Sequence, residues 1–345
     1  MANFTKATKR DLRLLADDGE KRGPLTIYQL AFHPSQNLLF GACSDRRLAC
    51  WDLDGPVQDL KKLGKANLAK FICPHDLGWI RSFCTNNDGS MLLTGGSDRT
   101  IRQWQLHSDH TTKVAHVQEN AHVGWVEALA LSTDGKRLLS AGADQSVALW
   151  ELPTWKLLKR FHEHKGYVRC VTWTHDAKYF FSAGEDGKLF QWDAKNTELL
   201  RTFEYGEAND GFGQTPALSG IHGIFVSSDD KWLAVAGAKS TIILDVATGN
   251  QVAGDNSPAQ VTFSPTGAVL AKGSDTVQVL NYEDSKFKTV EMPKNAKSRP
   301  TPGIPGKVIA SIKLGGFSRG LAFHPNGRTL ACGKDDGTVE LWDLL

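Results

Sequence analysis

Histidine, serine and aspartate side chains occur in this chain at spacings that could carry acyl-transfer chemistry. In that chemistry a histidine takes the proton of a serine hydroxyl and an aspartate orients the histidine, and His122, Ser140 and Asp144 have these residue types. The same pattern recurs in His164, Ser182 and Asp186 and, with Thr for Ser and one extra residue, in His75, Thr94 and Asp98. A nucleophile needs to occur only once, beside an oxyanion hole. We therefore interpret the sets as parts of a repeated fold, and we expect a protein without enzymatic activity.

Each set lies inside a repeated unit. The segments 92–104, 138–150 and 180–192 align without gaps, and each reads as a strand, a turn containing Gly and Asp, and a second strand that ends in Trp. An apolar strand that follows a His precedes each pair, and a fourth strand lies between units. Four short strands separated by turn residues predict an antiparallel meander. Further copies, two of them degenerate, lie at 42–52, 232–245, 268–281 and 330–343.

The residue that ends the second strand of each pair marks the repeat. These residues are Trp51, Trp104, Trp150, Trp192, Leu244, Leu280 and Trp342, which makes seven units about 48 residues apart, close to the ~40–45 residues of WD40 repeats. Three of the Trp residues are followed directly by Asp. With these features the chain resembles the WD40-repeat family over essentially its whole length. The resemblance implies an all-β fold, a seven-bladed β-propeller with four antiparallel strands in each blade.

In the WD40 family the recurring polar residues resemble a structural tetrad. The resemblance implies that four polar side chains are linked by hydrogen bonds in each complete blade. They are the His before the first strand, the Ser or Thr of the second strand, the Asp of the next turn and the Trp of the third strand. Blades two, three and four are expected to hold complete tetrads, which are His75, Thr94, Asp98 and Trp104; His122, Ser140, Asp144 and Trp150; and His164, Ser182, Asp186 and Trp192. Blades five and six lack the Asp, Ser and Trp, so we expect them to be the least cooperative part of the ring.

The repeats predict a single domain over residues 1–345, although the length alone suggests two. The expected blades, in order, are 25–75, 76–122, 123–164, 165–206, 220–256, 257–316 and 317–345. The last unit contains only three strands, so its blade would expose an unpaired edge. Residues 10–18 resemble the outer strands of the other units. We predict that this N-terminal segment closes the ring as the outer strand of blade seven.

The starts of the first strands predict a binding face. Propellers of this family mostly act as rigid scaffolds for peptides or protein domains, and the resemblance implies that the loops leading into the first strands form the binding surface. Alignment of the units there gives two columns of equivalent positions. The aromatic column consists of Trp79, Trp125, Tyr167 and Phe317. The polar column, two residues later, consists of Tyr28, Arg81, Glu127, Arg169, His222 and Arg319. Aromatic and Arg side chains dominate binding hot spots. We predict a protein or peptide partner, and an acidic or phosphorylated segment would suit the arginines. Packing between blades is the alternative interpretation of the aromatic column.

Three insertions decorate the predicted ring. Residues 206–220 are rich in Gly and lead into blade five, so we expect them on the binding face. Residues 54–66 and 283–306 lie between third and fourth strands and are expected on the opposite face. The second of these is rich in Pro and Lys. It is either a solvated loop or a docking segment for an acidic partner.

Composition argues against several other classes of protein. With 40 basic and 38 acidic side chains, a dedicated nucleic-acid or membrane-surface binder is not expected. No apolar stretch is long enough to span a membrane, and we expect a monomeric cytoplasmic protein. The six Cys form no C-x-x-C pair, and we expect neither a metal nor a cofactor. Two alternatives remain: an enzyme or small-ligand site at the channel mouth, using Glu127 and His222, and nucleic-acid binding through residues 283–306.

Overall fold

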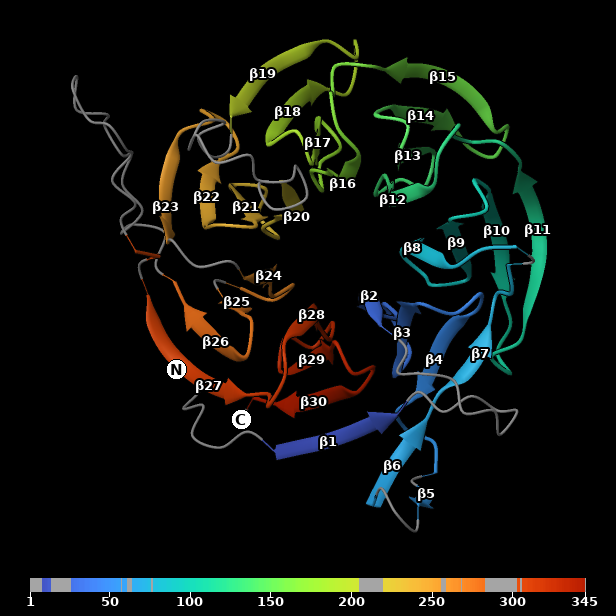
Figure 1. Ribbon diagram of the computed structural model, residues 1–345, viewed down its shortest axis with the longest axis vertical. Coiled ribbons are helices and arrows are strands. Elements are labelled where there is room, and N and C mark those ends of the chain that lie inside the picture. The colour runs from blue at the N-terminus through green and yellow to red at the C-terminus, as the bar shows by residue number, and fades with distance from the viewer. Residues whose placement is uncertain are drawn as a thin grey trace, which may run out of the picture.

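The repeated units fold as seven β-sheets arranged like blades around a common axis (Figure 1). The computed structural model describes residues 8–13, 26–56, 58–60, 64–75, 77–204, 220–255, 259–267, 269–282, 303–304 and 306–344. Six of the sheets are four-stranded antiparallel meanders, and the seventh contains two additional strands. The predicted seven-bladed propeller with four antiparallel strands per blade is therefore confirmed.

The first four blades follow the chain from the inner strand to the outer strand. Blades one and two consist of β2 (Ile27–Phe32), β3 (Leu38–Cys43), β4 (Leu48–Asp52) and β7 (Lys70–Ile72), and of β8 (Ile80–Thr85), β9 (Met91–Gly96), β10 (Ile101–Leu106) and β11 (Thr112–Gln118). Blades three and four consist of β12 (Val126–Leu131), β13 (Arg137–Gly142), β14 (Val147–Glu151) and β15 (Lys156–Phe161), and of β16 (Val168–Trp173), β17 (Tyr179–Gly184), β18 (Lys188–Asp193) and β19 (Leu199–Glu204).

The last three blades complete the ring. Blades five and six consist of β20 (Ile221–Val226), β21 (Trp232–Gly237), β22 (Thr241–Asp245) and β23 (Gln251–Asp255), and of β24 (Gln260–Phe263), β25 (Val269–Gly273), β26 (Thr276–Asn281) and β27 (Lys307–Lys313). Blade seven consists of β28 (Ser318–Phe323), β29 (Thr329–Lys334), β30 (Val339–Asp343) and β1 (Thr8–Arg13). Each inner strand packs against the inner strands of both neighbouring blades, and β28 packs against β2, so the last blade meets the first.

The N-terminal strand β1 closes the ring. It pairs antiparallel with β30, from Thr8 opposite Asp343 to Leu12 opposite Val339 (Figure 1). Leu12 is 1% exposed and belongs to the same core cluster as Val339. The strand predicted at residues 10–18 begins earlier, at Thr8, and the residues that follow Arg13 up to position 25 lie outside the described part of the chain.

The insertion at residues 54–66 contributes to the ring's edge rather than only to one face. Its described part contains β5 (Gln58–Leu60) and the start of β6 (Gly64–Leu68), which form a hairpin. β6 runs parallel to β1 and pairs with it at Leu12 and Arg13. The hairpin therefore extends the sheet of blade seven beyond the closing strand, a pairing that the strand pattern did not predict.

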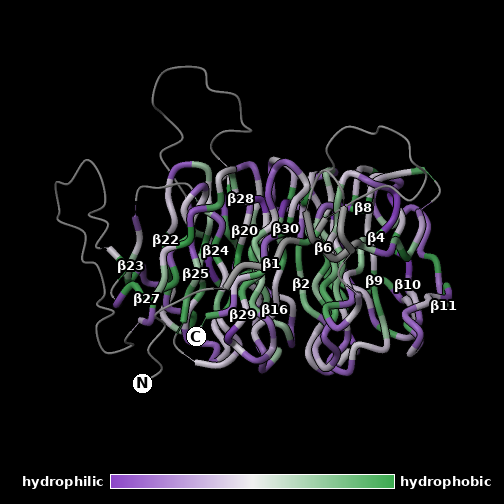
Figure 2. Tube along the Cα trace, turned by 90° about the horizontal axis from the view of Figure 1, so that it is seen from below, coloured by the Kyte–Doolittle hydropathy of each residue, from purple (hydrophilic) through white to green (hydrophobic). Residues whose placement is uncertain are grey.

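The core lies between neighbouring blades. The second strands β3 and β21 are buried along their whole length, because each is covered on both faces by an adjacent blade. Outer strands such as β11 and β15 are largely exposed. Figure 2 shows the same division, with hydrophobic residues along the strands and hydrophilic residues at the turns of both faces.

One register is shared by all seven blades. The residue that marks each repeat pairs with the second residue of the preceding strand, as Leu39 with Trp51, Leu138 with Trp150 and Leu233 with Leu244. The other four blades pair in the same way, as Leu92 with Trp104, Phe180 with Trp192, Leu270 with Leu280 and Leu330 with Trp342. Leu244 and Leu280 thus fill the place of the tryptophan in blades five and six, and both are buried.

Candidate functional site

The three His–Ser/Thr–Asp–Trp sets form buried hydrogen-bonded chains within single blades. In blade three the Trp150 indole N–H donates to Ser140 Oγ over 2.9 Å, and Ser140 Oγ lies 2.8 Å from His122 Nε2. His122 Nδ1 lies 3.0 Å from an Asp144 carboxylate oxygen. Because the indole can only donate, the single hydroxyl proton of Ser140 goes to Nε2, and the imidazole proton on Nδ1 goes to the carboxylate. Every polar atom of the chain then has a partner.

Blades two and four repeat this arrangement. His75 lies 2.9 Å from Asp98 and 2.7 Å from Thr94, whose Oγ1 accepts from Trp104. The corresponding chain in blade four joins Asp186, His164, Ser182 and Trp192. The three hydroxyl groups belong to residues that are fully buried, and each already has an indole on one side and an imidazole on the other. A substrate carbonyl has no access to them, so the sets are structural.

The aspartates of the sets in blades three and four also hold the loops that lead into those blades. Asp144 accepts from the backbone N–H of Val123 over 2.8 Å and from that of Ser146 over 3.1 Å. Burial raises the pKa of the Asp144 carboxyl, but the hydrogen bond and charge of His122, with the other donors, outweigh it and place that pKa below its usual value. The pKa values of Asp98 and Asp186 are lowered by the same balance.

The polar column sits on β-bulges. In six inner strands the pairing with the second strand skips one residue, as at Arg81 between Ile80 and Ser82 and at Glu127 between Val126 and Ala128. The skipped residues in the other four strands are Tyr28, Arg169, His222 and Arg319. A bulge frees a residue from the ladder and redirects its side chain. The six bulges therefore turn all six predicted side chains toward the ring axis, where they line one cavity of about 630 Å³.

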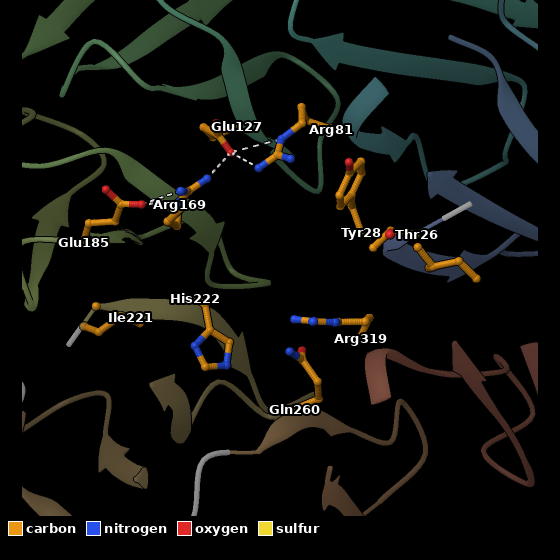
Figure 3. Close-up of a pocket in the computed structure, with 12 residues that line it drawn as sticks. Thr26, Tyr28, Arg81, Glu127, Arg169, Glu185, Ile221, His222, Gln260 and Arg319 are labelled. Carbon is orange, nitrogen blue, oxygen red and sulfur yellow. Dashed lines mark hydrogen bonds and ion pairs between the residues drawn. The ribbon is translucent and has the colours of Figure 1, made fainter. Parts of the chain in front are cut away.

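We call this cavity the channel mouth, and one side of it carries an ionic network (Figure 3). Glu127 Oε2 accepts from Arg81 Nη2 and Arg169 Nη1, each over 2.8 Å, and its side chain is 2% exposed. Arg169 also donates to Glu185, through Nε over 3.0 Å. Burial lowers the pKa of Arg169, but Glu127 and Glu185 raise it by more. Arg81 and Arg169 are thus already paired, which corrects the expectation that all the arginines of the column are available to an acidic partner.

The residues of the aromatic column are exposed and directly precede the inner strands of blades two, three, four and seven. The fractions of side chain left accessible are 46% for Trp79, 44% for Trp125, 42% for Tyr167 and 60% for Phe317. Arg81 lies 4.5 Å from the ring centre of Tyr28 and 5.7 Å from that of Trp125. Arg169 lies 5.5 Å from the ring centre of Tyr167. Packing therefore leaves a large part of each of these aromatic residues accessible. We call this surface, with the channel mouth, the aromatic face.

Glu185 and Gln260 line the channel mouth but were not among the predicted site residues. Glu185 lies in the turn between β17 and β18, directly before the tetrad residue Asp186, and no first-strand alignment includes it. The position before the tetrad aspartate in each such turn lies at this face, and that position is the signal that could have identified Glu185. Gln260 is the first residue of β24 and lines the channel mouth. Because β24 has no bulge, Gln260 does not align with the bulged residues of the polar column.

Several predictions concern residues outside the described part of the chain. They include most of the insertion at 206–220 and most of the basic segment at 283–306. The six cysteines are described; all are free, and burial raises the pKa of Cys43, Cys50 and Cys170 to about 12. The described residues contain no group of three or more His, Cys, Asp or Glu that could hold a metal ion. They also contain no helix long and apolar enough to cross a membrane.

Comparison with known proteins agrees with the architecture. Over its full length the chain superimposes on a chain of the crystal structure of a mitotic checkpoint complex, with a TM-score of 0.72 and 17% identity, covering 99% of this chain and 96% of that one. This likeness concerns the fold. Protein groucho of Drosophila melanogaster is 35% identical over 79 residues, which are 23% of this chain and 9% of groucho.

The sequence profile described as WD domain, G-beta repeat matches five segments, which are residues 19–52, 67–105, 112–151, 155–193 and 315–343. Together they span just over half of the chain and lie in blades one to four and blade seven, the blades that keep the tryptophan of the third strand. This match, together with the seven blades and the three tetrads, shows that the chain belongs to the WD40 family.

Proposed function

We propose that this protein is a non-enzymatic scaffold whose protein or peptide partner docks on the aromatic face. WD40 propellers are mostly scaffolds of this kind, and the observation that carries the proposal is the set of four exposed aromatic residues that directly precede inner strands lining one polar cavity. Large aromatic groups supply most of the apolar area at binding hot spots, and neighbouring Arg groups add directional donors. Trp125 lies beside Arg81, and Tyr167 beside Arg169, in this way.

Rigidity of the ring supports the proposal. On the face opposite the aromatic residues, the turns after the inner strands of blades two and three are each tied to the next blade: Asn87 donates to Thr133, and Thr133 donates to His175. The backbone N–H groups of His175 and Asp176 donate to Asp230 in blade five. A surface fixed before binding loses little conformational entropy when a partner docks. The closing strand β1 comes from the same chain, which supports the proposal that the propeller acts as a monomer.

The experiment is a cross-linking pull-down from a native lysate with wild type and a Trp79→Ala, Trp125→Ala double variant. Both tryptophans are exposed, so the variant is expected to fold like the wild type. Truncation of hot-spot aromatics typically costs ~2 kcal/mol or more each, so proteins that dock on the aromatic face should be lost from the variant.

The matched control is a Leu157→Ala, Leu199→Ala variant. These leucines are 42% and 41% exposed but lie on the outer strands β15 and β19, away from the aromatic face. It should recover the same proteins as wild type. If the aromatic variant also recovers all of them, the partner docks elsewhere and the proposal is wrong.

A further inference from the structure

Charges at the channel mouth are paired on one side only. The wall formed by blades two to four holds Arg81, Glu127, Arg169 and Glu185, and the ion pairs described above join all four. The cavity is lined by three arginines and two glutamates, so one positive charge is left over. That charge belongs to Arg319 on the opposite side.

The opposite wall brings together three polar side chains from blades five, six and seven. Figure 3 shows Arg319 and His222 pointing toward one another, with the Gln260 amide beside the guanidinium group. Within the described residues, no carboxylate lines this wall, and Arg319 makes no hydrogen bond or ion pair. Burial lowers the pKa of His222, and the positive charge of Arg319 lowers it further. The wall therefore offers a cation and an amide beside an imidazole whose pKa is held below its usual value.

A buried hydroxyl next to this wall also lacks a partner. Ser318 is 6% exposed, and its Oγ makes no hydrogen bond within the described residues. It lines a neighbouring hollow of about 370 Å³ together with His222, Gln260, Phe317 and Arg319. An unsatisfied buried hydroxyl costs about 1–3 kcal/mol and is rare in folded proteins. A ligand that accepts hydrogen bonds would satisfy it.

We propose that this wall, which we call the Arg319 wall, binds an oxyanion carried by the docked peptide, either a carboxylate or a phosphate group. The inference rests on the proposed function and adds the chemistry of the partner. The planar guanidinium group of Arg319 can hold two oxygens of the anion at once, while the Gln260 amide donates from the side. Phe317, beside Arg319 and 60% exposed, would cover an apolar neighbour of the acidic residue. Arg81 and Arg169 take no part, because they are already paired.

The experiment follows the imidazole signal of His222 by NMR while the full chain is titrated with inorganic phosphate or with acetate, against chloride at equal ionic strength. The His222→Gln spectrum assigns the signal. A saturable shift with phosphate or with acetate supports the site, and the anion that saturates first identifies the source. A shift that chloride reproduces, or no saturation with either anion, overturns the proposal.

Two variants locate the effect. Arg319→Gln should weaken the anion's apparent affinity by about tenfold or more, since hydrogen bonds to charged groups contribute about 1.5–3 kcal/mol. Arg328→Gln is the matched control, because Arg328 is an exposed arginine of the same blade at the opposite end of β28. It should leave the affinity unchanged, and equal losses in both variants would contradict the site. No partner protein is used, so failure here with loss of partners in the Trp79→Ala, Trp125→Ala variant removes the oxyanion site and leaves the proposed function intact.

Discussion

At the scale of single residues, the same side chains can be catalytic or structural, and the direction of their hydrogen bonds decides between the two. A nucleophilic serine must give its proton to the histidine while its lone pair faces a substrate. Ser140 gives its proton to His122, but its lone pair is occupied by the Trp150 indole. The chain therefore ties the third strand to the loop before the first strand, and it has no free position for chemistry.

Removal of the Asp144 carboxylate should destabilise the propeller. Asp144→Ala leaves the His122 and Val123 donors without their acceptor, and we expect a loss of ~1–3 kcal/mol in the free energy of unfolding. Urea denaturation followed by tryptophan fluorescence measures it.

Asp336→Ala is the control for this loss. Asp336 occupies the same turn position in blade seven, but it has no tetrad histidine and its side chain is 54% exposed. It accepts from Thr338 and lies 3.7 Å from the Lys334 ammonium group. The control should lose less than about 1 kcal/mol. Equal losses in the two variants would show that the aspartate acts only on its own turn.

The residues of the site were predictable, but their pairing was not. Repeat alignment placed Arg81, Glu127 and Arg169 in one column because the same bulge recurs in each inner strand. The alignment compares equivalent positions and contains no distances between blades. Arg81 and Arg169 share Glu127, and Glu185 joins them from the turn between β17 and β18. Both contacts depend on how neighbouring blades are placed side by side.

At the scale of elements, β1 decides whether the ring is closed. It covers the edge of β30 and buries Leu12 among the residues of blades one and seven. An uncovered β30 would present a row of unpaired backbone groups, which promotes association between chains. The closing strand was predictable because its pattern matches that of the other outer strands. The parallel pairing of β6 with β1 was not, since it involves two short segments far apart in the sequence.

Truncation of Leu12 should weaken the closure. Leu12→Ala opens a cavity at a side chain that is 1% exposed, and we expect a loss of about 2–5 kcal/mol in the free energy of unfolding. Leu200→Ala on the outer strand β19, where the side chain is 43% exposed, is the control and should change stability by less than about 1 kcal/mol. Thermal unfolding of both variants compares them, and a similar small change in both would mean that β1 is not needed for closure.

At the scale of the whole molecule, the ring is uniform in architecture and uneven in its polar reinforcement. Blades two to four contain complete tetrads, whereas blades five and six have Leu244 and Leu280 at the tryptophan position and rely on apolar packing. The count of seven units was predictable because the apolar register is kept even where the polar residues are lost. How firmly each blade is held depends on hydrogen bonds that only some blades make.

Amide hydrogen exchange should reveal this difference. The strands β13 and β21 are both buried almost throughout, so burial alone predicts similar protection. Because each missing hydrogen bond removes ~1 kcal/mol, we expect the amides of β21 and β22 to exchange at least about fivefold faster than those of β13 and β14. Mass spectrometry of peptides from the two blades measures the rates. Equal protection would mean that the tetrads add nothing to local stability.

The central claim is that a partner protein docks on the aromatic face. The most direct measurement places the photo-cross-linking residue benzoylphenylalanine at Trp125 or, as control, at Leu158, which is 43% exposed on the outer strand β15. If the partner docks on the aromatic face, a protein from native lysate should cross-link at position 125 and not at 158. Excess wild type should also suppress the cross-link, whereas the Trp79→Ala, Trp125→Ala variant should not. Cross-linking of the same protein only at position 158, or equal suppression by both competitors, would contradict the claim.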